Sequence, residues 1–104
     1  LPLYRAIGDK LGEANVLMSL GDMLIAQQEW QQAIQQYEQA LPIYRSIGAK
    51  LGQANTLIDL GRAYFAVGDQ QKGAACEQEA IAIYTAIGLL DWAERAKGYL
   101  AAGK

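Results

Sequence analysis

The chain has 104 residues, is 52% hydrophobic, contains only 2 prolines and carries a formal net charge of −2. This composition is typical of a helix-rich globular protein and not of a disordered chain. Because no basic excess is present to neutralise phosphates and no basic amphipathic face to meet anionic lipid, nucleic acid and membrane partners are not expected. Histidine is absent and Cys76 is the only cysteine, which excludes the common zinc sites, internal disulfides and catalysis by Ser-His-Asp or Cys-His groups.

A stretch of eleven residues, positions 11–21, returns forty residues later at positions 51–61 with seven identical residues. The match extends upstream, because positions 1–5 recur as positions 41–45. Self-similarity at a fixed period of about 20–50 residues is typical of a stacked repeat array. We therefore divide the chain into the tail of a preceding helix (1–8), a first repeat (9–48), a second repeat (49–88) and a partial repeat or terminal helix (89–104). The chain begins within a repeat, so we interpret it as part of a longer protein.

Glycines mark the predicted helix ends. Gly8, Gly48 and Gly88 occupy the same position of the repeat, and glycine tolerates the left-handed conformation just past a helix. The first helix is therefore expected to stop at Gly8, with Asp9 as the N-cap of the next helix. That helix is predicted over about 10–27. Its buried stripe follows helical spacing and consists of Leu11, Ala14, Leu17, Leu20, Gly21 and Leu24.

The next helix is predicted over about 30–47, and it contains a proline. Its apolar stripe consists of Trp30, Ala33, Ile34, Tyr37, Leu41, Tyr44 and Ile47. An interior proline such as Pro42 removes one backbone hydrogen bond and costs about 3 kcal/mol. The alternatives are a kinked continuous helix and a break near Ala40. We favour the kink, because the apolar spacing continues to Ile47, and Pro2 occupies the equivalent position of the repeat.

The second repeat predicts helices over about 49–67 and 70–87, separated by a turn at Gly68-Asp69. The inward stripe of the first of these consists of Leu51, Ala54, Leu57, Leu60, Gly61 and Tyr64. Glu77 stands at the position of Tyr37, and we expect its side chain to reach the surface. A last amphipathic helix is predicted over about 90–102. No sustained alternation predicts a strand, so the expected fold is all-α, an α-solenoid of antiparallel helix pairs.

The plan of helix, short turn and helix, with Leu-x-x-Leu-Gly in the first helix and Gly-Asp at the turn, resembles the tetratricopeptide repeat. The usual period of that repeat is 34 residues, whereas the period here is forty. The longer form with Gly-Asp-Lys-x-Gly-Glu-Ala looks like the repeats of kinesin light chains. The Ala-Leu-Pro-x-Tyr-Arg-x-Ile-Gly segment is similar to bacterial, particularly cyanobacterial, multi-repeat proteins. The resemblance implies a right-handed superhelix. Four residues differ from the types usual at their positions in the family's repeat: Leu24, Gln28, Gly73 and Glu77.

In this family the first helix of each pair lines a concave groove, so the resemblance places the residues beside the buried stripe against a ligand. These residues are Asn15, Met18, Ser19, Asp22 and Ile25, then Asn55, Ile58, Asp59, Arg62 and Phe65, and finally Arg95 and Tyr99. Such a mixture of amides, charges and apolar groups suits an extended or helical peptide. The alternatives are structural. The two asparagines could bond between neighbouring repeats, the apolar members could be packing residues, and Asp22 with Arg62 could form a weak surface ion pair.

The expected function is a non-enzymatic adaptor or scaffold segment that binds a protein or peptide in this groove, without a cofactor or a metal. The alternative is a structural spacer or self-assembling repeat unit within a larger multidomain signalling protein, with self-association through exposed ends of the array. No cysteine pairing indicates an oxidising compartment, so the expected location is the cytoplasm.

Overall fold

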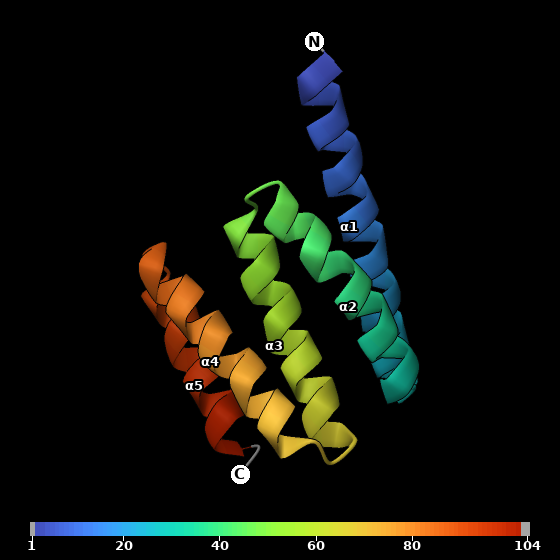
Figure 1. Cartoon of the computed structure of the whole chain (residues 1–104). Helices are drawn as coiled ribbons and strands as arrows, with labels where there is room; N and C mark the ends of the chain where they lie inside the picture. Colours follow the sequence, from blue (N-terminus) through green and yellow to red (C-terminus); the bar gives the residue numbers. More distant parts are fainter. Residues whose placement is uncertain (1, 103–104) are drawn as a thin grey trace.

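The computed structural model describes the backbone of residues 2–102 and the side chains of residues 7–98, 100 and 101. The described chain folds into five helices, which are α1 (Pro2–Ala26), α2 (Trp30–Ser46), α3 (Lys50–Ala66), α4 (Gln70–Ala86) and α5 (Leu90–Ala102), and it contains no strand. Each helix packs against the next one in the chain, and Figure 1 shows them side by side in sequence order. This arrangement confirms the predicted all-α solenoid. Within residues 2–102, no helix combines the length and the hydropathy needed to cross a membrane.

One turn geometry recurs between all consecutive helices, at residues 28, 48, 68 and 88, which have φ values of 61°, 71°, 88° and 83°. In the first of these turns, the Gln28 N–H donates to the carbonyl of Ile25 and the Glu29 N–H donates to the carbonyl of Leu24. The other three turns repeat both bonds, which together form a Schellman motif. The predicted ends at Gly48 and Gly88 are confirmed, as is the turn at Gly68. Gln28 adopts the same left-handed conformation without the freedom of glycine, at a cost of about 1 kcal/mol.

The predicted helix end at Gly8 is wrong, and so is the predicted N-cap at Asp9. Helix α1 runs through both residues without interruption. Glycine permits a left-handed turn but does not require one, and the turn forms where the following helix packs back on the preceding one. The continuous α1 satisfies the backbone hydrogen bonds of the residues on both sides of Gly8 within one helix.

Helix α2 continues through Pro42 to Ser46, which agrees with the favoured continuous helix, and the alternative of a break near Ala40 does not occur. Tyr37 and Tyr44, which are both buried, flank the proline on either side. The packing of these two rings offsets the one backbone hydrogen bond that proline removes. Pro2 is the first residue of α1. At this position the lack of an N–H removes no hydrogen bond of the helix.

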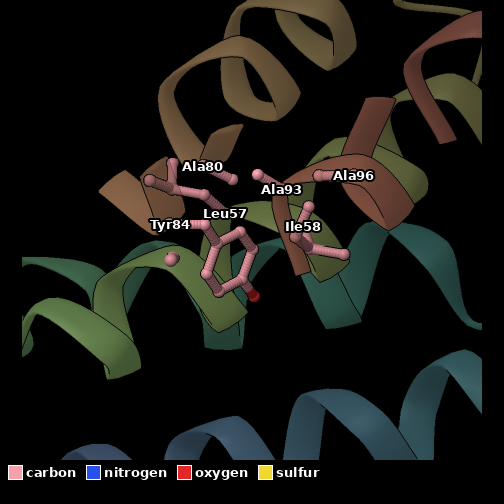
Figure 2. Packing of buried hydrophobic residues seen from close by; sticks show 7 residues of the cluster. Leu57, Ile58, Ala80, Tyr84, Ala93 and Ala96 are labelled. Carbon is pink, nitrogen blue, oxygen red and sulfur yellow. The ribbon is translucent and has the colours of Figure 1, made fainter. Parts of the chain in front are cut away.

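Close contact between the helices depends on tyrosine rings that lie over glycines. A Cβ atom at Gly21 would lie 2.6 Å from Tyr37 Cε1, and a Cβ atom at Gly52 would lie 2.5 Å from Tyr44 Cδ1. The first contact joins α1 to α2, and the second joins α2 to α3. The same combination of small and large residues fills the cluster between α3, α4 and α5 (Figure 2). Its buried members are Ala54, Leu57, Ile58, Ala80, Tyr84, Ala93 and Ala96.

The predicted inward stripes are only partly buried. Ala14, Gly21, Ala54 and Gly61 lie in the interfaces, whereas three predicted core leucines, Leu11, Leu20 and Leu51, are exposed. Leu51 retains 48% of its accessible surface. The physical reason is the close approach of the helices: the smallest residues of each stripe lie at the closest contacts, and of the larger ones Leu57 and Leu60 are buried in the core clusters.

Glu77 does not reach the surface, so this prediction is also wrong. Its side chain is 0% exposed and lies against Gly61, as Tyr37 lies against Gly21. Among the described residues, neither carboxylate oxygen of Glu77 has a hydrogen-bond partner. Burial raises the pKa of Glu77 to about 8; the charge of Asp59 adds to this effect and that of Arg62 opposes it. The repeat places position 77 directly over the paired helix, where even a carboxylate has no route to water.

Candidate binding groove

A cavity of about 250 Å³ lies on the face formed by the odd-numbered helices, with one wall from α4. Its lining residues are Met18 of α1, Asn55, Ile58, Asp59 and Arg62 of α3, Tyr84 of α4, and Trp92, Arg95 and Ala96 of α5. Six of these were predicted to face a ligand: Met18, Asn55, Ile58, Asp59, Arg62 and Arg95. Residues from three first helices therefore meet around one space, as the repeat phase predicts.

The remaining predicted residues have other surroundings. Asn15 lines a second cavity beside the start of α3. Ile25 packs into the cluster around Tyr37. Phe65 lies against α4, since a Cβ atom at Gly73 would lie 2.7 Å from the Phe65 ring. Ser19 is exposed and does not line either cavity. The side chain of Tyr99 lies outside the described residues.

Both asparagines of the predicted site take part in bonds within a helix pair. The Tyr44 hydroxyl donates to Asn15 Oδ1, and the Tyr84 hydroxyl donates to Asn55 Oδ1, each over 2.5 Å. These bonds join the first helix of a pair to the second helix of the same pair, not one repeat to its neighbour. The recurrence of asparagine at a fixed phase of the repeat therefore has a structural explanation.

Replacing Tyr44 or Tyr84 by phenylalanine is expected to lower the free energy of unfolding by about 1 kcal/mol in each case. The two effects should be similar, because each change leaves an asparagine carbonyl without its hydroxyl donor. Urea denaturation followed by circular dichroism measures this difference. Tyr64→Phe is the control, since the Tyr64 hydroxyl bonds to Glu38 at the exposed surface. If Tyr44→Phe and Tyr84→Phe were as stable as the wild type, these bonds would not hold the pairs together.

Ionisable groups form a connected cluster beside the cavity. The Tyr37 hydroxyl donates to Asp22 Oδ1 over 2.5 Å, and Asp22 lies close enough to Asp59 for the two carboxyl groups to interact. Burial, together with the neighbouring Asp22, raises the pKa of Asp59 to about 7, and the charge of Arg62 opposes this rise. Burial and the bond to Asp22 likewise raise the pKa of Tyr37. Asp22 thus accepts a hydrogen bond from Tyr37 and interacts with Asp59, whereas the charge of Arg62 acts on Asp59 and Glu77.

The two repeats fill the same packing position with side chains of different chemistry. In the first repeat, Tyr37 crosses Gly21 and reaches Asp22. Forty residues later, Glu77 crosses Gly61 beside Arg62, which occupies the position of Asp22. A tyrosine–carboxylate hydrogen bond is therefore replaced by a buried carboxyl group close to a guanidinium.

Sequence reasoning missed Tyr84, Trp92 and Ala96 as cavity walls. Trp92 stands forty residues after Gly52, the glycine over which the Tyr44 ring lies. The equivalent ring, Tyr84, instead meets the Trp92 ring with a centroid distance of 6.0 Å. A tryptophan at a position where the earlier repeat has glycine is the signal that could have identified this wall.

A sequence model of the tetratricopeptide repeat matches residues 1–46 and residues 12–86 of the chain. A search of curated proteins finds no match. The similarity to kinesin light chains and to cyanobacterial repeats rests on the forty-residue period and on two short sequence segments, and it stays a prediction. The matched model covers most of the chain, and the helices, turns and stacking agree with it. The chain belongs to the tetratricopeptide repeat family.

Proposed function

We propose that the chain is a non-enzymatic interaction module, an adaptor or scaffold segment of cytoplasmic proteins that binds a peptide or protein segment in its concave groove. The observation that carries this proposal is the cavity of about 250 Å³, whose walls come from α1, α3, α4 and α5. Tetratricopeptide repeats in general mediate interactions between proteins, which agrees with this assignment.

The walls of the cavity suit the anchor side chain of a peptide. Met18, Ile58 and Trp92 supply apolar surface, while Asn55, Asp59, Arg62 and Arg95 supply polar groups. Concave, largely apolar sites with a few polar groups are typical of ligand binding. Trp92 is exposed, and exposed tryptophans are among the residues that most often dominate binding energy.

Trp92→Ala is expected to weaken peptide binding at least about tenfold, which corresponds to about 1.4 kcal/mol. The ligands would be peptides selected from a random library on the immobilised chain, with affinities measured by isothermal titration calorimetry. Val16→Ala is the matched control, because Val16 is 60% exposed on the opposite face of α1. Equal affinities for the Trp92→Ala and Val16→Ala variants, or a selection that yields no peptide, would contradict the groove assignment.

A second candidate function is self-assembly, and the outer face of α1 favours it. Val16, Leu20 and Met23 are exposed there, and their spacing of four and three residues aligns them on one side of the helix. A second copy of the chain could cover this row. Light scattering across a concentration series tests the idea together with Leu20→Glu, which should abolish association. A wild-type protein that stays monomeric at the highest concentration would exclude it.

A further inference from the structure

The outer face of α1, at one end of the stack of helices (Figure 1), carries an apolar row that the described residues leave uncovered. Val16, Leu20 and Met23 form this row and retain 60%, 42% and 57% of their accessible surface. Their spacing of four and three residues places them on one side of the helix. Contiguous exposed apolar side chains of this kind are typical of an interaction site.

The same row is buried in the two later odd-numbered helices. Forty residues after it stand Thr56, Leu60 and Ala63 of α3, all of them buried. Leu60 and Ala63 belong to one core cluster with Ile34 of α2. A further forty residues on, Ala96 of α5 is buried in a cluster with residues of α4. In both cases the preceding helix of the chain packs over the row.

A position near the start of each odd-numbered helix is the site where the covering helix places an aromatic ring. The Tyr44 ring of α2 lies over Gly52 of α3, and the Tyr84 ring of α4 meets the Trp92 ring of α5. Gly12 is the equivalent position of α1. A Cβ atom at Gly12 would meet nothing within 4 Å among the described residues. The outer face of α1 therefore has both the apolar row and the space for a ring.

We propose that the outer face of α1 binds an amphipathic helix of a partner protein, which lies against α1 as α2 lies against α3. The residues that α2 brings to α3 include Ile34, Leu41 and Tyr44, whose spacing of seven and three residues places them on one side of a helix. The partner helix carries apolar residues at this spacing and an aromatic ring that covers Gly12. A second folded copy of the chain does not offer such a helix, because its own α2 is packed between α1 and α3.

One position of the partner helix is expected to differ from α2. The Tyr64 hydroxyl of α3 donates to Glu38 of α2, whereas Leu24 stands forty residues before Tyr64. Leucine has no hydroxyl, so a carboxylate opposite Leu24 would gain no hydrogen bond. An apolar side chain at this position would instead bury additional apolar surface. The docking site on α1 thus selects a more apolar helix than α2 itself.

The test uses the intact chain and a synthetic peptide with the sequence of residues 30–47. Gln35→Lys and Gln39→Glu, at two positions that are exposed on α2, allow a lactam bridge that holds the peptide helical. Circular dichroism confirms its helicity before use, and fluorescence anisotropy of the labelled peptide measures binding.

The peptide is expected to bind the wild-type chain, and Leu20→Glu in the chain should weaken this binding at least about tenfold, because the contact would bury an unpaired charge. Tyr44→Ala in the peptide should weaken binding similarly by removing the ring that covers Gly12. Glu38→Leu in the peptide should strengthen it. Since Leu20 is exposed, Leu20→Glu should remain folded, which circular dichroism checks.

Leu90→Glu is the matched control, because Leu90 is an exposed leucine of α5 outside the row, and this variant should bind as the wild type does. A helical peptide that fails to bind, or that binds the Leu20→Glu chain equally well, would overturn the inference. Binding that is lost in Trp92→Ala would place the peptide in the groove and would overturn it too. A wild-type dimer that Leu20→Glu dissociates would assign the row to a second copy instead.

Discussion

Gly21→Ala is expected to lower the free energy of unfolding by about 1–3 kcal/mol, the usual cost of overfilling a packed interface. The added methyl group would lie 2.6 Å from Cε1 and 2.7 Å from Cζ of Tyr37. That ring is fully buried and its hydroxyl is held by Asp22, so it cannot move aside without losing the bond. The α1–α2 pair would have to separate, which disturbs a contact on which the first repeat depends.

Gly12→Ala is the matched control for this change, in the same helix. A Cβ atom at Gly12 meets nothing within 4 Å, so alanine there should stabilise the chain by about 0.5–1 kcal/mol through its higher helix propensity. Urea denaturation of the two variants gives opposite signs if steric contact is the reason for Gly21. A Gly21→Ala protein that gained stability would show that the Tyr37 ring has room to shift.

The second large effect concerns Glu77, whose replacement by glutamine should raise stability increasingly as the pH rises. Burial raises the folded-state pKa of Glu77 from 4.5 to about 8. Below the unfolded pKa, the carboxyl is protonated in both states, and the wild type and Glu77→Gln should be similarly stable. Between about pH 4.5 and pH 8, the unfolded wild type loses a proton that the folded protein retains, so its stability falls by up to about 4–5 kcal/mol. Above that range the difference should remain constant.

Unfolding of both proteins in urea at a series of pH values measures this divergence. Glu79→Gln is the control, because Glu79 lies two residues away in an exposed ion pair with Arg45 and should contribute less than about 1 kcal/mol. Glu77→Leu should be more stable than the wild type even at low pH, since it removes the polar group from the interface. A constant difference between wild type and Glu77→Gln across the pH range would mean that the Glu77 carboxyl reaches solvent.

The helices and most turns could be predicted from the sequence because their determinants are local. A Schellman turn needs a residue that tolerates positive φ just past the helix. Gly48, Gly68 and Gly88 meet this need, so the sequence indicates the three turns. The same reasoning failed at Gly8, where α1 continues, and did not predict the left-handed Gln28. A glycine makes the turn possible, but whether the chain turns depends on the packing of the helices on either side.

The groove was predictable in outline. Helical periodicity places Asn55, Ile58, Asp59 and Arg62 on one side of α3, and all four line the cavity. Periodicity fixes the direction in which a side chain leaves its own helix, and nothing more. It therefore could not show that Phe65 meets Gly73 of α4 or that Tyr84 bonds to Asn55.

By itself, the sequence determined the all-α class, the repeat, the helix pairs and the face that each helix turns towards the groove, because propensity, turn chemistry and periodicity act within a few residues. Only the tertiary structure decided which residues pack against each of these faces. It buried Glu77 where a surface position was expected, brought Asp22 of the first repeat close to Asp59 of the second, and placed Trp92 in the cavity wall. These contacts join residues that lie on different helices. Their geometry follows from how closely two helices approach, which glycines and alanines on both of them set together.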